Sequence, residues 1–314
     1  MRYRVELISL DEKDELVERH SSKVLYEVKA DIYGVCIKLL TTEKWVAEKW
    51  SENFYHFNEK NIRSHGRLYV LRDESMDRNL VLYNSYSNTA FLFNFTYYGW
   101  IKSIALSVAG DILEDDHGIY SVHGACLDID GKGVAIVAPS GVGKTTHAYG
   151  LMRLPQTRVI ADDFFYVRIL QDLLAFSTEK SFYVRADLAS IWPEYAEIMK
   201  HAEVDSEGRA VVDIRWAVGK GRVIPQTTLK STLILKRDPE DPREVYTPKV
   251  GEALEYLKEH SYCNPHWLVR DQRKERIRER FYRTLLEKTR TIVVNTMTPP
   301  KRTHENIRRA LGLK

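Results

Sequence analysis

The stretch Ala138-Pro139-Ser140-Gly141-Val142-Gly143-Lys144-Thr145 decides how the rest of the chain is interpreted. It follows the apolar run 134–137 and opens a segment with helical character. It fits the Walker A pattern, with Ala in the first position instead of Gly. Glycines let the backbone turn tightly and aim its N–H groups inward, and the next helix adds free N–H groups and a positive dipole end. The stretch therefore predicts a phosphate-binding loop between a strand and a helix.

The polar residues of this loop have expected roles. The Lys144 amine is expected to reach the β- and γ-phosphates of a nucleotide, and the Thr145 hydroxyl to bind Mg²⁺. The alternative is a glycine-rich turn with a chance Gly-Lys-Thr, and the strand before it and the helix after it weigh against that alternative. The motif contacts phosphates and not the base, so it does not separate ATP from GTP. The predicted nucleotide contacts are Ser140, Gly141, Val142, Gly143, Lys144, Thr145 and Thr146.

A second motif follows the loop, where residues 159–163 read Val-Ile-Ala-Asp-Asp. Carboxylates at the end of a neighbouring parallel strand would lie beside the phosphate loop. One of Asp162 and Asp163 can hold Mg²⁺ directly or through water, and the other could accept the proton of an attacking hydroxyl. A solvated turn is the alternative for the pair. Because a simple ATPase needs only the metal-binding carboxylate, the second one favours transfer to a bound acceptor.

The surrounding sequence predicts an α/β domain over residues 96–314. Two strands, 120–129 and 133–138, are joined by Asp130-Gly131, which is a good hairpin signal. Apolar spacing predicts an amphipathic helix over 97–113. Further strands are expected at 158–161, 232–236 and 291–295, and helices at 270–289 and 302–312.

The preceding region, residues 1–95, is expected to be rich in strands. It is either a separate small domain or a layer on the main one, and it could bind substrate or form an oligomer interface. A helix is expected to interrupt it around 42–50. The expected strands are 24–28, 33–39, 67–71, 80–83 and 90–95.

Bulk properties exclude several classes of protein. The chain has 314 residues, of which 44% are hydrophobic and 29% charged, a balance typical of a folded globular protein. The net charge of +3 gives no reason to expect nucleic acid or an anionic membrane as a partner. No apolar run is long enough to cross a membrane, and the start is charged rather than signal-like. The three cysteines form no CxxC pair, so we expect reduced thiols and a cytoplasmic location.

Taken together, residues 121–127, 131–137, 138–145 and 159–163 resemble the catalytic core of HPr kinase/phosphorylase. That core has His-Gly on the strand before a hairpin, then a phosphate loop, then a strand that ends in Ala-Asp-Asp. The resemblance implies a P-loop kinase core of the HPr kinase/phosphoenolpyruvate carboxykinase type with ATP, Mg²⁺ and a seryl hydroxyl as acceptor. By position it implies that Lys144 binds phosphate, Thr145 and Asp162 serve Mg²⁺, and Asp163 is the general base. His123 would lie beside the acidic pair and tune its proton affinity, whereas a lone His on a strand is usually a packed or surface residue.

The chain also departs from that family. Thr145-Thr146 stands where the family has Ser-Glu, and residues 238–251 do not resemble its later glycine-rich signature. These departures weigh against HPr as substrate and against the reverse phosphorylase reaction. They favour the diverse relatives that act on free serine or on small peptides. We therefore expect an ATP-dependent kinase for a hydroxyl of a small molecule, peptide or protein. Proteins of this family are often oligomers, so the resemblance is compatible with a homo-oligomer.

Three segments outside the core motifs are further candidates. Arg185 could clamp the transferring phosphoryl group, because a planar guanidinium suits charge spread over three oxygens, and Glu179 could be a second Mg²⁺ ligand. An ordinary surface position is the alternative for Arg185. The basic loop 219–222 is more simply a solvated turn than a phosphate contact. The cluster 262–267, Tyr-Cys-Asn-Pro-His-Trp, indicates packing or part of an acceptor pocket.

Two other functions stay open. The first is a nucleotide-binding regulatory or peptide-binding module with little or no transferase activity, which would need Lys144 but not Asp163. The second is a carboxykinase-like phosphotransferase for a carboxylic acid or an enol, which would need metal-binding Lys and His residues that the sequence does not place.

Overall fold

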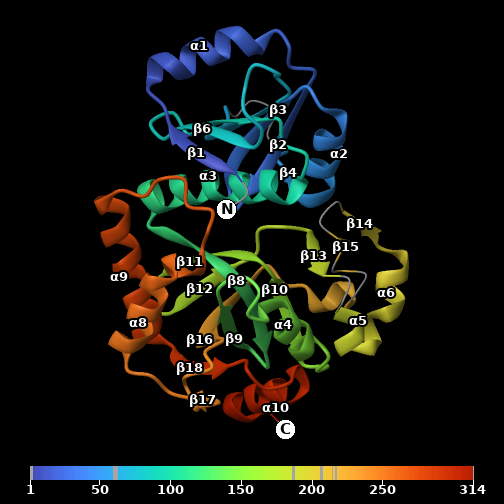
Figure 1. Cartoon of the computed structure of the whole chain (residues 1–314), viewed down its shortest axis with the longest axis vertical. Coiled ribbons are helices and arrows are strands. Elements are labelled where there is room, and N and C mark those ends of the chain that lie inside the picture. The colour runs from blue at the N-terminus through green and yellow to red at the C-terminus, as the bar shows by residue number, and fades with distance from the viewer. Residues whose placement is uncertain are drawn as a thin grey trace. The chain divides into compact units, whose positions relative to one another are not determined.

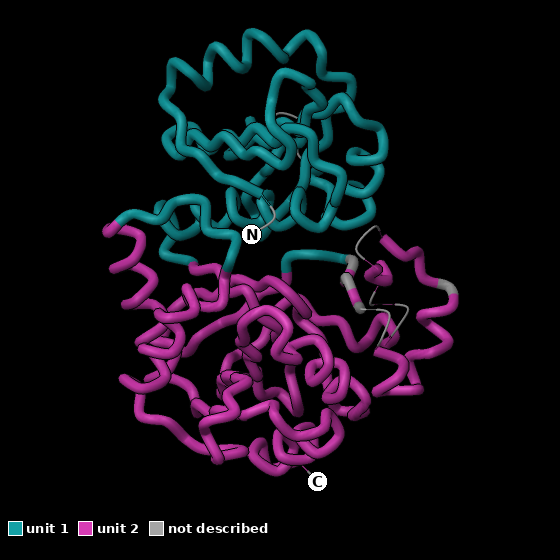
Figure 2. Tube along the Cα trace, in the orientation of Figure 1, with its two compact units in different colours: residues 1–119, 178–181, 265–271 teal, residues 120–177, 182–264, 272–314 magenta. Residues whose placement is uncertain are grey.

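The structure is a computed structural model that describes residues 3–58, 63–185, 188–205, 208–213, 215 and 218–313 (Figure 1). The side chains of Ser181, Tyr183, Arg185 and His201 lie outside that description. The chain forms two compact units (Figure 2). The first unit contains Met1–Ile119, Thr178–Ser181 and Pro265–Asp271, and the second contains Tyr120–Ser177, Phe182–Asn264 and Gln272–Lys314.

The first unit is a mixed sheet with helices, and the expected strands between residues 24 and 95 are confirmed. The strand order is β1-β6-β7-β5-β3-β2-β4. One helix was not expected from the sequence, α1, which begins after Ser9. The strands are β1 Arg4–Leu7, β2 Tyr26–Ile32, β3 Val35–Thr41, β4 Tyr55–His56, β5 Gly66–Leu71, β6 Leu80–Asn84 and β7 Thr89–Phe93, and the helices are α1 Leu10–Ser21, α2 Lys44–Asn53 and α3 Tyr98–His117.

The second unit is built on a larger sheet with the strand order β10-β8-β11-β12-β16-β18-β17, in which β9 pairs with β8 and β16. A small sheet, β13-β15-β14, accompanies it. The strands are β8 Ile119–Ile129, β9 Lys132–Val137, β10 Thr157–Ala161, β11 Phe164–Ile169, β12 Leu173–Phe176, β13 Ser181–Arg185, β14 Glu203–Val204, β15 Arg209–Asp213, β16 Gln226–Lys236, β17 Val245–Tyr246 and β18 Arg290–Asn295. The helices are α4 Lys144–Met152, α5 Leu188–Ile191, α6 Ala196–His201, α8 Val250–Glu259, α9 Gln272–Lys288 and α10 Pro300–Leu311, with short 3₁₀ turns η1 Pro193–Tyr195, η2 Lys220–Arg222 and η3 Ser261–Cys263.

The hairpin that precedes the loop is confirmed. Leu127 of β8 faces Val134 of β9 in antiparallel register. Asp130 and Gly131 have φ of 53° and 77°, which is the left-handed conformation that a tight hairpin turn requires.

The expected neighbourhood of the phosphate-loop strand and the acidic strand is wrong in one respect. The strand β10 pairs antiparallel with β8, and β8 pairs antiparallel with β9. The two strands therefore run in the same direction, but β8 lies between them. The reason is that β9 already pairs with β8 on one side and with β16 on the other. No side of β9 is left for β10, which pairs with β8 instead. This order puts the middle of β8, Gly124 to Cys126, between the ends of β9 and β10.

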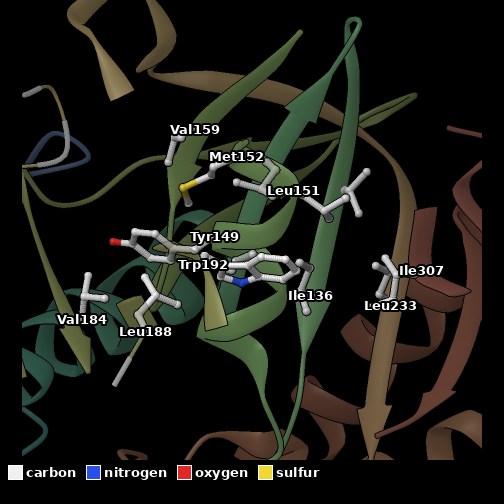
Figure 3. Close-up of a cluster of buried hydrophobic side chains, with 14 of the residues drawn as sticks. Ile136, Tyr149, Leu151, Met152, Val159, Val184, Leu188, Trp192, Leu233 and Ile307 are labelled. Carbon is white, nitrogen blue, oxygen red and sulfur yellow. The ribbon is translucent and has the colours of Figure 1, made fainter. Parts of the chain in front are cut away.

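Alternate residues of these strands serve two cores on the opposite faces of the sheet. Ile136 and Leu233 belong to one core, and their neighbours Val137 and Ile234 belong to the other. Figure 3 shows the first core, where side chains from β9, α4, β10, β16 and α10 form one cluster. The helices α4 and α10 pack against each other beside it. Among the residues that the structure describes, no helix is long and apolar enough to span a membrane.

Candidate active site

The phosphate loop has the backbone that an anion cradle needs. Gly141 and Gly143 have φ of 80° and 108°, and α4 begins directly after them at Lys144. Gly143 is the N-cap, and no side chain caps the helix there, so the N–H groups of the first turn remain available for an anion. No heavy atom lies within 4 Å of the place where a Cβ on Gly141 would be. The loop therefore fits a phosphate group.

Three of the predicted residues meet at one oxygen beside this loop. Lys144 Nζ lies 2.7 Å from Asp163 Oδ1, and His123 Nε2 lies 3.3 Å from the same oxygen. The Gly124 N–H donates to the Asp163 carbonyl at 2.9 Å, which fixes the chain just past β10 against β8. The fold thus brings together a loop lysine, a carboxylate and an imidazole from three separate elements.

The two carboxylates of the acidic pair differ in accessibility. The side chain of Asp163 is 29% exposed, whereas Asp162 is only 4% exposed. Burial raises the pKa of Tyr149 on α4 most, and the charge of Asp162 raises it further. An acceptor can reach Asp163 more easily than Asp162, and this difference favours Asp163 as the base.

The balance of the surroundings lowers the pKa of His123. Burial lowers its pKa most, the nearby Lys144 ammonium lowers it further, and the Asp163 carboxylate opposes both. Its other ring nitrogen, Nδ1, lies 2.7 Å from the Cys263 carbonyl oxygen. A neutral imidazole can donate with one nitrogen and accept with the other, so the orientation of this ring matters for any proton transfer at Asp163.

The other residues predicted to contact the nucleotide lie in the turn before α4 and in its first helical turn. Thr145 and Thr146 lie in the first turn of α4 and are half-buried, while Ser140 and Gly141 are exposed. The Val142 N–H reaches the Pro139 carbonyl at 3.4 Å, which closes the loop on itself. The arrangement leaves the Thr145 hydroxyl and the Asp162 carboxylate as candidate ligands for Mg²⁺.

Glu179 and Arg185 are not brought to this cluster by any described contact. Glu179 belongs to the first unit, where its carboxylate accepts from Lys102 Nζ at 2.9 and 3.2 Å and from Asn53 Nδ2 at 3.0 Å. These bonds occupy both of its oxygens, so its place beside Mg²⁺ stays a prediction that the contacts do not favour. The side chain of Arg185 lies outside the described residues.

The described part of the chain holds no group of three or more His, Cys, Asp and Glu side chains that could bind a metal ion by itself. Mg²⁺ in a nucleotide site usually takes only one or two carboxylates and completes its shell with phosphate oxygens and water.

Two contacts of the site could not be anticipated from residue types. The first is the contact of His123 with the backbone carbonyl of Cys263, in the cluster 262–267, so this cluster contributes a backbone group and not a side chain. Trp192 donates its indole N–H to the Thr146 carbonyl at 2.8 Å from outside the motif. The basic loop at 219–222 has a structural role, because the Arg222 guanidinium donates to the carbonyls of Leu154 and Thr157.

Comparison with known proteins finds a distant and partial relationship. No family model matches the chain. By sequence, 116 residues, or 37% of the chain, are 30% identical to HPr kinase/phosphorylase of Streptococcus pneumoniae strains 70585 and JJA, and the match covers 32% of those proteins. The chain thus matches about a third of the length of these curated relatives. The solved HPr(Ser) kinase/phosphatase from Coxiella burnetii aligns with a TM-score of 0.28 and 16% identity over 40% of this chain and 70% of that one, a score too low for structural argument.

Proposed function

We propose that this chain is an ATP-dependent kinase that transfers the γ-phosphoryl group to a serine hydroxyl of a peptide, a protein or a free amino acid. The observation that carries the proposal is the meeting of Lys144 and His123 on the accessible carboxylate of Asp163, next to an uncapped helix N-terminus. A phosphate cradle alone would suit any nucleotide-binding protein. A carboxylate poised beside it is what a transfer to a hydroxyl requires in addition.

In this proposal, different residues of the site bind phosphate, accept the proton and hold the metal ion. The backbone N–H groups of the loop and of the first turn of α4 bind phosphate oxygens, and Lys144 turns from Asp163 towards them. Oδ1 of Asp163 then accepts the proton of the acceptor hydroxyl. Thr145 and Asp162 would hold Mg²⁺, which neutralises charge on the phosphates. Arg185 remains a candidate clamp for the transferred group.

The resemblance to HPr kinase/phosphorylase supports the same reaction class. We include in the proposal a hydroxylated small-molecule, peptide or protein partner, no nucleic-acid partner, a cytoplasmic location and a homo-oligomeric state. The small net charge of +3 supports the absence of nucleic acid. Free, buried thiols at Cys36, Cys126 and Cys263 are in keeping with a reducing compartment.

The test is a direct search for the acceptor. The purified protein is incubated with ATP and Mg²⁺ and with free serine, other hydroxylated metabolites or serine-containing peptides, and phosphate on the acceptor is measured by mass spectrometry. Lys144→Ala and Asp163→Asn are expected to lose the product. Asp172→Asn is the matched control, because Asp172 is exposed and pairs with Lys230.

The outcomes are distinct. Phosphate on an acceptor that disappears in both site variants and persists in the control supports the kinase. Nucleotide binding that needs Lys144, with no transfer to any acceptor and no effect of Asp163→Asn, refutes it and favours a regulatory module.

A further inference from the structure

The turn η3 contains an unusual backbone. Ser261, Tyr262 and Cys263 have φ of 51°, 53° and 57°, so three consecutive residues with side chains are left-handed. Each such residue is disfavoured by about 1–2 kcal/mol relative to the right-handed conformation. None of them is Gly, Asn or Asp, the residues that enter this region readily. Strain of this kind persists only where the surroundings enforce it, and it is concentrated at functional positions.

The surroundings of the turn do enforce it. The Cys263 N–H donates to the His260 carbonyl at 2.9 Å, and the Asn264 N–H donates to the Ser261 carbonyl at 3.1 Å. The Tyr262 ring stacks on Tyr282 of α9 with centroids 4.7 Å apart, and Tyr262 is only 1% exposed. The turn is therefore a built and buried feature of the second unit.

The turn aims one group at the candidate active site. The Cys263 carbonyl oxygen lies 2.7 Å from His123 Nδ1. A carbonyl oxygen can only accept a hydrogen bond, so Nδ1 must carry the proton. In a neutral imidazole the other nitrogen, Nε2, then carries a lone pair, and Nε2 is the nitrogen that faces Asp163 Oδ1 at 3.3 Å. An ionised carboxylate only accepts hydrogen bonds, so this lone pair opposes the ionised form of Asp163. It accepts a hydrogen bond from Asp163 once the carboxyl carries a proton, as a base does after it takes the proton of the acceptor hydroxyl.

We propose that the left-handed turn Ser261–Cys263 is a positioning element that fixes the tautomer of His123, with the proton on Nδ1 and the lone pair of Nε2 directed at Asp163. The turn does not touch the reacting atoms and acts through the His123 ring. The inference deepens the proposed function, since it concerns the partner of the proposed base. Its structural content does not depend on which acceptor the protein phosphorylates.

The tautomer can be measured without nucleotide or substrate. Histidine ¹⁵N shifts and two-bond couplings in labelled protein at pH 8 distinguish a protonated Nδ1 from a protonated Nε2, and the signals of His123 are identified by their loss in His123→Gln. We expect the Nδ1–H tautomer in the unmodified protein. An Nε2–H tautomer overturns the proposal whatever the variants do.

Two variants at Cys263 test whether the turn sets this state. Cys263→Gly keeps the left-handed conformation accessible, and we expect it to retain the Nδ1–H tautomer. Cys263→Val introduces a β-branched residue that strongly disfavours positive φ, and we expect a mixture of tautomers or the Nε2–H form. Cys36→Val in β3 is the matched control, because a strand accepts a β-branched residue at a buried cysteine.

Unchanged His123 signals in a folded Cys263→Val protein overturn the role of the turn. If circular dichroism shows that Cys263→Val does not fold, Cys263→Gly decides. Loss of the Nδ1–H tautomer of His123 in Cys263→Gly overturns the role of the turn. The Nδ1–H tautomer in both Cys263→Gly and the unmodified protein supports that role. A protein with the expected tautomer and no transferase activity would refute the proposed kinase and leave this inference standing.

Discussion

Lys144 and Asp163 are bound to one another, and this pairing has consequences for the proposed binding of phosphate. Their charged atoms are 2.7 Å apart, and the lysine side chain is only 12% exposed. An incoming phosphate must therefore compete with the Asp163 carboxylate for the lysine. We therefore expect the proposed base to weaken the proposed nucleotide binding until Lys144 is drawn away.

Substitution of Asp163 should separate binding from chemistry. We expect Asp163→Asn to abolish transfer but to bind ATP with Mg²⁺ more tightly, by about three- to tenfold, because the amide releases Lys144 at a gain of about 1 kcal/mol. Lys144→Ala should weaken binding by about tenfold or more. Titration calorimetry measures both, with Asp172→Asn as the control. Weaker binding by Asp163→Asn would show that Asp163 helps to hold the nucleotide complex instead.

The sequence predicts the side chains of this site better than it predicts their partners. The loop, the Asp-Asp pair and the His-Gly step have side-chain signatures, and the structure does bring Lys144, Asp163 and His123 together. The Cys263 carbonyl has no such signature, because every residue has one. Ser, Tyr and Cys are also not residue types that indicate positive φ, so the left-handed turn could not be foreseen.

At the scale of elements, the packing of α4 on α10 depends on a glycine. A Cβ on Gly150 would lie 2.7 Å from His304 Nδ1 and 2.9 Å from Trp192 Cζ2. In α8, by contrast, a Cβ on Gly251 would meet nothing within 4 Å. A larger residue is therefore excluded at Gly150 by its neighbours, whereas there is room for one at Gly251.

We expect Gly150→Ala to destabilise the protein by about 1–3 kcal/mol, since the clash outweighs the gain in helix propensity. Gly251→Ala should stabilise it by up to about 1 kcal/mol. Thermal and denaturant unfolding give both values. A Gly150→Ala protein as stable as the unmodified one would mean that α10 can move away from α4 at little cost.

The same helix pair carries two buried histidines. The rings of His147 and His304 stack with an interplanar angle of 3°, and each Nδ1 is buried without a hydrogen-bond partner. Burial lowers the pKa of both to about 4, aided at His147 by the charge of His304 and at His304 by Arg153 and Arg308. The unfolded chain has ordinary histidines near 6.5, so between these values it binds more protons than the folded chain.

Stability should therefore be complete above about pH 6.5 and fall as the pH drops towards 4, by about 1.4 kcal/mol per pH unit for each histidine. His304→Gln is expected to make unfolding less dependent on pH over this interval. His117→Gln, at an exposed position, should follow the unmodified protein. Melting curves between pH 4.5 and 7.5 compare the slopes, and equal slopes for His304→Gln and the unmodified protein would contradict the expectation.

Element prediction succeeded where local signals were strong. The hairpin at Asp130-Gly131 and the terminal helices α9 and α10 have clear patterns and are present. The helix α1 was missed although Ser9 and Glu12 form a capping box, a signal that the sequence does carry. The position of β8 between β9 and β10 was missed because strand order is set by pairing across the sheet and not by local sequence.

At the scale of the whole molecule, the first unit is completed by short segments from far along the chain. The segment Thr178–Ser181 supplies Glu179 to Lys102 of α3, and their side chains are only 4% and 2% exposed. The Lys180 N–H donates to the Asn53 carbonyl at 2.8 Å, and its Nζ to the Ser51 carbonyl at 2.7 Å. Such segments leave no mark in the sequence, because their partners are more than 70 residues away.

A buried ion pair makes the stability of the unit depend on both partners at once. Removal of one charge leaves the other buried and uncompensated, which costs about 3–5 kcal/mol, whereas removal of both costs far less. We therefore expect Lys102→Met and Glu179→Gln each to lower the denaturation midpoint strongly, and the double variant to recover most of the loss. Glutamine keeps an oxygen for Asn53 Nδ2, so the double variant tests the charges and not that hydrogen bond.

The exposed pair of Lys230 and Asp172 provides the matched cycle, with Lys230→Met and Asp172→Asn. Its coupling should be at most about 1 kcal/mol, because solvent screens both groups. Urea unfolding of the two sets of variants gives the two coupling energies. Additive losses at Lys102 and Glu179 would mean that water reaches the pair. A large coupling would instead show that Glu179 is already committed to a structural partner, which weighs against its service as a metal ligand.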